Sequence, residues 1–360
     1  MKVLPRLLSP ALLLLLAGCL AQQPPRAAPP LPLEPPLRKW VLQGWMPFHN
    51  IAWVDNERVM FEGTTAAVAG KGGARSLWLW DLKGPPRRLL AASSGACSSK
   101  GVITAYRKSA AGQPPQGVRF TGPDFQPQPW QPSRPPGKRF FEPISCTSLP
   151  LPPRLRGLSW HALSREDGYL EFGPNDRINE RRHVPVYRWD AALQQRLDTG
   201  IRIDWPILAR VDYAAHDDSY LFYDFNMSRA DKEKWRSINA FRIWRINKDF
   251  RGYPIDVPGG IWLDQDVSFL PARPGIVITS NNFSRKGEPV GAGIYLLLPN
   301  RQSKRIERGL AEKTMISPNG CRLAYSFIPR LDTTLAQGGP RLVAIDLCQV
   351  ESANKLNQKR

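Results

Sequence analysis

Short runs of alternating apolar and polar residues recur along most of the chain, each entered through a tight turn rich in Asp, Asn, Gly or Ser. Six such turn-and-run segments span residues 54–63, 98–107, 164–173, 216–225, 271–280 and 317–326. These turn residues supply the backbone angles that hairpins need, and period two is the repeat of a β-strand. The pattern therefore predicts six short strands, each following a turn.

A second apolar run follows each of these strands after a polar insertion of variable length. The second runs span 77–84, 117–122, 186–193, 243–249, 294–300 and 342–348, and a third run follows at 87–90, 195–200 and 303–309. Units of three or four strands that recur every ~40–70 residues are typical of a β-propeller. The sequence therefore predicts an all-β fold, a single propeller of six blades over residues 38–350.

Two segments carry a family resemblance. Ser317-Pro318-Asn319-Gly320-Cys321-Arg322-Leu323-Ala324-Tyr325 is similar to the SPDGxxIAF turn and strand of TolB-type, WD40-like propellers, and Leu77–Leu82 (LWLWDL) resembles the strand that follows it. The resemblance covers most of residues 48–348, fits the last blade best, and is interrupted by proline-rich insertions between 122 and 158. It implies a propeller that docks other proteins during envelope assembly.

The end of the chain leaves the last blade without an outer strand. Residues 351–360 (ESANKLNQKR) show no apolar alternation and are expected to be a disordered tail, whereas 38–42 (RKWVL) resembles the run RRLL at 87–90. Because an open ring would leave a sheet edge unpaired, we expect 38–42 to pair with the last blade and close the ring.

The N-terminus has the three parts of an export signal. Lys2 and Arg6 precede the apolar run Leu12–Leu16, which is too short to span a bilayer. Leu16-Ala17-Gly18-Cys19 resembles the lipobox of bacterial lipoproteins, which implies a signal peptide at 1–18 and lipid on Cys19. The alternative is an ordinary secretory signal with an incidental cysteine.

The residues after Cys19 bear on location and reach. Leu20 stands where inner-membrane retention usually requires Asp, so the resemblance implies the periplasmic side of the outer membrane, with surface exposure left open. Residues 19–37 are expected to form a proline-rich tether. Residues 22–37 of it should extend roughly 50 Å, at about 3.1 Å per residue.

Charge restricts the class of partner. The formal net charge is +19, and +17 without Lys2 and Arg6. Such a field favours anionic partners, although charge that only keeps the domain soluble is an equal alternative. Nucleic acid is disfavoured because the chain is exported and has no basic-aromatic motif.

Cysteine and histidine positions predict no metal or cofactor. Besides Cys19 the chain holds Cys97, Cys146, Cys321 and Cys348, none with CxxC spacing. Three pairings are open, and Cys321–Cys348 with Cys97–Cys146 is favoured because Cys321 and Cys348 flank neighbouring strands.

The six insertions are expected to emerge on one face and to form an anion-binding rim. They span 64–76, 107–116, 174–185, 226–240, 281–293 and 327–340. Their cations include Lys71, Arg75, Arg107, Lys108 and Arg177. The candidate ligand-binding residues are Arg181, Arg182, His183, Lys232, Lys234, Trp235, Arg236, Asn281, Asn282, Arg285 and Lys286.

No catalytic motif stands out. The chain has no GxSxG, HExxH, GxxxxGK[ST] or GxGxxG segment, and His216-Asp217-Asp218 occupies a turn position of the repeat. Glu62, Glu171 and Asp224 lie near strand ends, where some propeller enzymes gather carboxylates.

We therefore expect a monomeric, non-catalytic binding or scaffold propeller for a cell-envelope protein or an anionic glycan. The alternative is a hydrolase or lyase acting on envelope polysaccharide. A third hypothesis is protection against a toxin delivered by a neighbouring cell, and no residue of the sequence specifically supports it.

Overall fold

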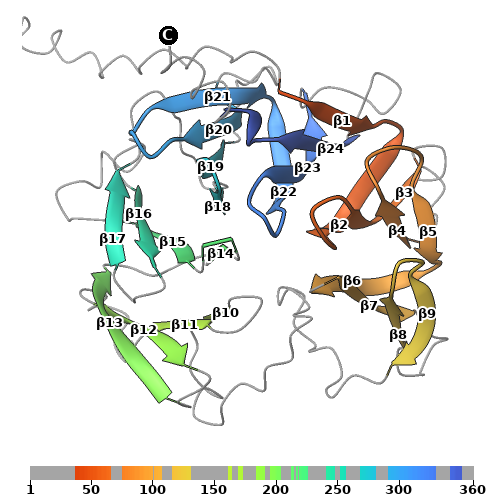
Figure 1. The fold of residues 1–360 in the computed structure, drawn as a ribbon, viewed down its shortest axis with the longest axis horizontal. Coiled ribbons are helices and arrows are strands. Elements are labelled where there is room, and N and C mark those ends of the chain that lie inside the picture. Colours follow the sequence, from red (N-terminus) through yellow and green to blue (C-terminus); the bar gives the residue numbers. More distant parts are fainter. Residues whose placement is uncertain are drawn as a thin grey trace, which may run out of the picture.

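The computed structural model describes residues 37–65, 75–99, 101–107, 116–130, 161–163, 169–172, 184–190, 195–203, 212–214, 216–217, 219–225, 241–247, 252–256, 268–280, 291–329 and 341–350. Their strands form six four-stranded antiparallel sheets arranged around a common centre (Figure 1). The fold is a β-propeller, as the repeat predicts.

Each sheet is one blade, with its strands in chain order from the axis outward. Blade 1 holds β2 (Trp45–Trp53), β3 (Val59–Thr65), β4 (Ser76–Trp80) and β5 (Arg87–Leu90). Blade 2 holds β6 (Ser93–Ser99), β7 (Val102–Arg107), β8 (Gln116–Thr121) and β9 (Gln126–Trp130). Blade 3 holds β10 (His161–Leu163), β11 (Tyr169–Phe172), β12 (Val184–Asp190) and β13 (Gln195–Ile203).

The remaining blades follow the same order. Blade 4 holds β14 (Asp212–Ala214), β15 (Ser219–Phe225), β16 (Phe241–Ile246) and β17 (Gly252–Asp256). Blade 5 holds β18 (Ser268–Ala272), β19 (Gly275–Ser280), β20 (Gly293–Leu297) and β21 (Ser303–Arg308). Blade 6 holds β22 (Leu310–Ile316), β23 (Arg322–Ile328), β24 (Arg341–Asp346) and, outermost, β1 (Lys39–Leu42).

The core lies between blades, because the middle strands are covered on both sides. In β3, Met60 packs into a cluster shared with blade 2, while Val59 and Phe61 pack into one shared with blade 6. In β19, Val277 faces blade 6 whereas Ile276 faces blade 4. The period-two pattern thus sends alternate side chains into two different cores, which is why these strands are apolar throughout.

The outermost strands show how the free edges are protected. β9 pairs with β8 through Val118↔Pro129 and Phe120↔Pro127, and all but the last of its residues are exposed. Proline has no amide hydrogen, so this edge offers few donors to another strand. Sequence reasoning missed β9 because a proline-rich segment resembles a loop.

The predicted ring closure is confirmed. β1 pairs antiparallel with β24, with Trp40 opposite Ala344 and Val41 opposite Val343. The Trp40 ring lies between two guanidinium groups, 4.8 Å from that of Arg38 and 5.1 Å from that of Arg322. The N-terminal strand is therefore an integral part of the last blade.

Side-chain contacts join β1 and blade 6 to both of their neighbours. Lys39 forms an ion pair with Glu307 of blade 5, and the same carboxylate accepts a hydrogen bond of 3.0 Å from the Tyr325 hydroxyl. On the other side, Trp53 Nε1 of blade 1 donates to the Met315 carbonyl at 2.9 Å. These contacts join blade 6 to blade 5 through the closing strand and to blade 1 through the innermost strand.

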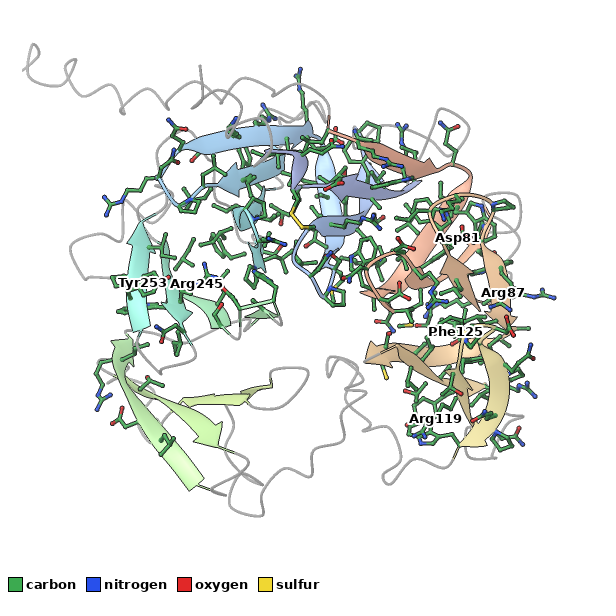
Figure 2. The ribbon with its side chains drawn as sticks, viewed as in Figure 1. Asp81, Arg87, Arg119, Phe125, Arg245 and Tyr253 are labelled. Carbon is green, nitrogen blue, oxygen red and sulfur yellow. A yellow bond between two sulfur atoms is a disulfide. The ribbon has the colours of Figure 1, made fainter. Side chains whose placement is uncertain are left out.

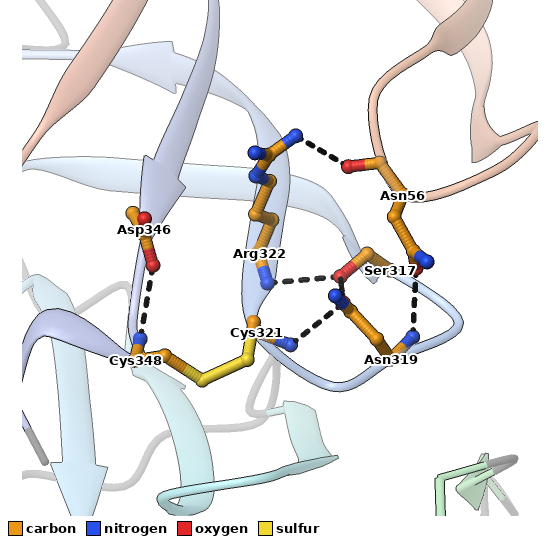
Figure 3. Close-up of a disulfide and its surroundings, with 7 residues drawn as sticks. All are labelled: Asn56, Ser317, Asn319, Cys321, Arg322, Asp346 and Cys348. Atoms are coloured by element: carbon orange, nitrogen blue, oxygen red, sulfur yellow. Dashed lines mark hydrogen bonds between the residues drawn. A yellow bond between two sulfur atoms is a disulfide. The ribbon is translucent and has the colours of Figure 1, made fainter.

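A disulfide joins the ends of β23 and β24, as the strand positions favour. Cys321 and Cys348 are bonded, with their Cα atoms 5.1 Å apart (Figure 3). The Leu347 amide also donates to the Cys321 carbonyl at 2.7 Å. Cys97 is disulfide-bonded as well, whereas Cys146, its favoured partner, lies outside the described residues.

Candidate functional site

The strand order gives the wheel two faces. The second strand of each blade runs toward one face and the third returns from it, so the six insertions begin and end there. We call this the insertion face. The opposite side, where the first strand turns into the second, is the turn face.

Four arginines lie at or next to insertion-face strand ends of blades 5, 6, 1 and 2, and a lysine lies in the middle of the innermost strand of blade 6. Arg308, Arg75 and Arg107 are exposed there, while Lys313 and Arg341 are half-buried. Among the described residues at these ends, Glu312 is the one exposed acid. Arg75 and Arg107 were expected at this rim, and the other three were not singled out by sequence.

Blade 4 differs from this cationic arc. Arg242 pairs in register with Asp224 on one side and Asp256 on the other, at the ends of β15, β16 and β17. The sequence of blade 4 thus alternates acid, base and acid across these three strands at this end. The arc therefore covers part of the insertion face rather than the whole of it.

Lys313 lies in the middle of the innermost strand of blade 6, at an irregularity of that strand. The β22–β23 register shifts between Glu312 and Met315, and Lys313 has a left-handed φ of 54°. Burial lowers the pKa of Lys313, Glu312 raises it, and Arg75 of blade 1 lowers it further. The positive charges of Lys313 in blade 6 and Arg75 in blade 1 are thus close enough to repel each other.

Glu62 is a buried carboxylate at the joint of blades 1 and 2. It is 3% exposed and accepts hydrogen bonds from Ser93 Oγ and, at 2.8 Å, from Asn50 Nδ2. Burial raises the pKa of Glu62, although these bonds and Arg75 oppose the rise. The carboxylate connects β2, β3 and β6 within the protein.

The three carboxylates weighed for catalysis do not share one register position. In the repeat, Trp78, Tyr187 and Trp244 are equivalent, and they pair with Phe61, Glu171 and Phe222. Glu171 therefore corresponds to Phe61, Glu62 lies one position later and Asp224 two positions later. All three are on second strands, one strand away from the axis.

His216 and Asp217 form the turn between β14 and β15, as the repeat predicts. The Asp217 carboxylate accepts hydrogen bonds from Ser219 Oγ at 2.7 Å and from Arg245, which Figure 2 labels. Ser219 is buried and donates to the aspartate instead of to a histidine base. A serine nucleophile needs the histidine in that position, so the turn is not a catalytic triad.

The turn face is drawn together by contacts between tight turns. The Arg273 amide of blade 5 donates to the Gly320 carbonyl of blade 6 at 2.9 Å, and the Asn319 amide donates to Asn56 of blade 1 at 2.9 Å (Figure 3). Farther out, the Arg58 guanidinium lies 4.6 Å from the centre of the Phe125 ring, and Figure 2 labels this ring and Arg87. These turns connect blade 5 to blade 2.

Acids on the turn face mostly cap its turns. Asp55 accepts from the Arg58 amide, Asp81 from the Lys83 amide and Asp346 from the Cys348 amide, at 2.8, 3.0 and 3.1 Å. Cations and acids therefore interleave here, in contrast to the cationic arc on the insertion face.

The predicted ligand-binding residues lie outside the described residues, as does Cys19. They are Arg181, Arg182, His183, Lys232, Lys234, Trp235, Arg236, Asn281, Asn282, Arg285 and Lys286. The described strand ends show only that the insertions carrying them open onto the same face as the cationic arc.

The described part of the chain contains neither a cluster of metal ligands nor a membrane-spanning helix. Its His, Cys, Asp and Glu side chains form no group of three or more suited to a metal ion. It contains no helix with the length and apolarity needed to cross a bilayer.

Similar solved structures have propeller folds. TolB from Acinetobacter baumannii matches at 12% identity over 82% of this chain and 65% of its own, with a TM-score of 0.38. A gluconolactonase from Xanthomonas campestris matches at 14% over 89% and 98%, with a TM-score of 0.39. An acylaminoacyl peptidase from Pyrococcus horikoshii matches at 8% over 81% and 43%, with a TM-score of 0.36.

The chain covers less than two thirds of the TolB and peptidase chains. No protein-family model and no curated protein sequence matches it. The propeller fold is defined by the chain's own strand order and register, and the likenesses concern the fold alone.

Proposed function

We propose that this protein is a lipoprotein with a TolB-like propeller, held on the periplasmic side of the outer membrane. Residues 1–18 act as a signal peptide, Cys19 carries the lipid, and the proline-rich segment to residue 37 tethers the wheel. The domain acts without catalysis, as a binding or scaffold propeller for a cell-envelope protein or an anionic glycan.

The cationic arc on the insertion face carries this proposal. Arg75, Arg107 and Arg308 are exposed at strand ends of three blades, with Glu312 as the one exposed acid among the described ends of that arc. Like charges held together on one surface raise the local concentration of an anionic partner. On the turn face, the aspartates that cap the turns lie among the cations, so the attraction for an anionic partner is weaker there.

Binding is tested with the full mature chain carrying Cys19→Ser and polygalacturonate as a polyanionic probe. We expect binding that weakens as salt is added, and that is lost in the triple variant Arg75→Glu, Arg107→Glu, Arg308→Glu. The matched control is Lys83→Glu, Arg273→Glu, Arg301→Glu, which changes the charge equally at exposed positions of the turn face. Equal loss in both variants, or release of sugar fragments from the probe, would overturn the proposal.

Attachment is tested separately by metabolic labelling with an alkyne fatty acid in a Gram-negative host. The intact chain is expected to take up the label and to fractionate with outer membranes. Cys19→Ser is expected to lose both properties. A labelled Cys19→Ser chain, or an unlabelled intact chain, contradicts lipid attachment at Cys19.

A further inference from the structure

The chain enters and leaves the wheel on the turn face. The Asp346 amide donates to the Arg38 carbonyl at 3.0 Å, and the Arg38 amide donates to Gln349 Oε1 at 2.7 Å. Both contacts lie beside the Cys321–Cys348 disulfide, at the turn-face ends of β23 and β24. The segment before Leu37 therefore starts from the face opposite the insertions.

Two tryptophans at strand ends, Trp45 of blade 1 and Trp130 of blade 2, add a second feature to the insertion face. Trp45 begins β2 and packs edge-on against Trp78, with ring centroids 4.4 Å apart. Trp130 ends β9, with the Arg119 guanidinium 5.7 Å from its ring. All three rings are partly exposed, and Trp45 and Trp78 also pack against the core between blades 6 and 1.

This pairing of rings and cations narrows the partner's chemistry. A partly exposed ring offers a flat apolar surface, and a nearby guanidinium offers donors to a carboxylate. A polymer of sugar rings with carboxylates presents both groups at every repeat and is long enough to cross several blades. An acidic protein surface needs the cations but not the rings.

We infer that the protein is a two-sided spacer, tethered to a membrane from its turn face and docking an anionic glycan on its insertion face. The inference rests on the proposed lipid at Cys19 and adds to it a direction and a partner class. The glycan approaches from the side away from the membrane, so both can be held at once.

The tether makes the direction testable. Its reach of roughly 50 Å would also allow the wheel to turn over and lay its cationic arc on anionic headgroups. In that arrangement the arc would be covered and the glycan excluded. Mounting on a membrane should therefore leave glycan binding unchanged in the first arrangement and weaken it in the second.

The experiment compares fluorescent polygalacturonate binding to the soluble Cys19→Ser chain and to the lipidated chain in vesicles. The vesicles contain phosphatidylethanolamine with a minor fraction of phosphatidylglycerol. We expect the two affinities to agree within about twofold. The Arg75, Arg107 and Arg308 triple variant should bind about a hundredfold more weakly in both forms, at about fivefold for each arginine lost.

The possible failures are distinct. A soluble chain that ignores polygalacturonate overturns the glycan as partner, and leaves the lipid to be judged by fatty-acid labelling. A soluble chain that binds while the mounted chain binds at least tenfold more weakly overturns the direction. Trp130→Ala should weaken binding to polygalacturonate more than binding to polyglutamate, and an equal effect on both overturns the role of the rings.

Discussion

His216 of blade 4 packs against Gly320 of blade 6, with Nδ1 only 2.7 Å from the point where a Cβ on Gly320 would stand. Blades 4 and 6 are not neighbours, so the two turns meet on the turn face from either side of blade 5. The Arg273 amide of blade 5 lies 2.8 Å from the same point. Three blades thus converge on one glycine.

Gly320→Ala should therefore lower the free energy of unfolding by about 3 kcal/mol, from left-handed strain together with overpacking. Gly44→Ala is the matched control, because Gly44 has a φ of 76° against 75° for Gly320 but no atom within 4 Å of its Cβ position. That control should cost about 1 kcal/mol. Equal losses in urea unfolding would show that the three turns do not converge.

Glu62 should make the protein less stable as the pH rises. Its folded pKa is raised above the ordinary value of 4.5, so the unfolded chain loses its proton first as the pH increases. The contribution to unfolding free energy is then fully present below pH 4.5 and declines as the pH rises through the folded pKa.

Glu62→Gln should remove this decline, measured as urea unfolding at a series of pH values above 4.5. Glu57→Gln, at an exposed position of the same blade, should keep the wild-type slope. A Glu62→Gln profile parallel to wild type would mean that the carboxylate is not buried.

Removal of the Cys321–Cys348 disulfide should destabilise the last blade. The bond closes a loop with a sequence separation of 27, for which the loss of chain entropy corresponds to about 3–4 kcal/mol. The double variant Cys321→Ser, Cys348→Ser should show this loss in denaturant unfolding. Reduction of that variant should still change its stability through Cys97, which is also disulfide-bonded.

Trp40 should contribute more to ring closure than its neighbour on the same strand. The Trp40 ring packs with the core between blades 6 and 1 and lies close to two guanidinium groups. Trp40→Ala should therefore lower the free energy of unfolding by about 2–3 kcal/mol. Val41→Ala, at a residue 39% exposed, should cost less than about 0.5 kcal/mol. Similar effects of the two substitutions would argue against this packing.

The sequence predicted the second and third strands of each blade and missed the innermost ones. β19 and β20 are buried along their whole length and have strong apolar patterns. The innermost strands β6 (SSGACSS) and β14 (DYA) are short or polar, so neither shows the apolar alternation of a buried strand. Because β6 lacks this alternation, the sequence predicted a turn at residues 98–99, where the structure has the end of β6.

The candidate site was predicted less completely than the fold. The sequence placed Arg75 and Arg107 on the right face because insertion ends follow from strand order. It gave no sign of Lys313, which depends on an irregularity within β22, or of Glu62 as a joint between blades. The irregularity at Lys313 is not marked by the repeated apolar pattern. The role of Glu62 depends on a contact between two blades.

Closure of the wheel by its N-terminal strand is tested most directly by zero-length carbodiimide cross-linking of the native protein. Lys39 and Glu307 form an ion pair across 268 residues of sequence, so we expect an amide between these two side chains in the peptide mass spectrum. Lys39→Gln should abolish that product alone. A native protein in which Lys39 couples to other carboxylates and never to Glu307 would contradict the closed ring.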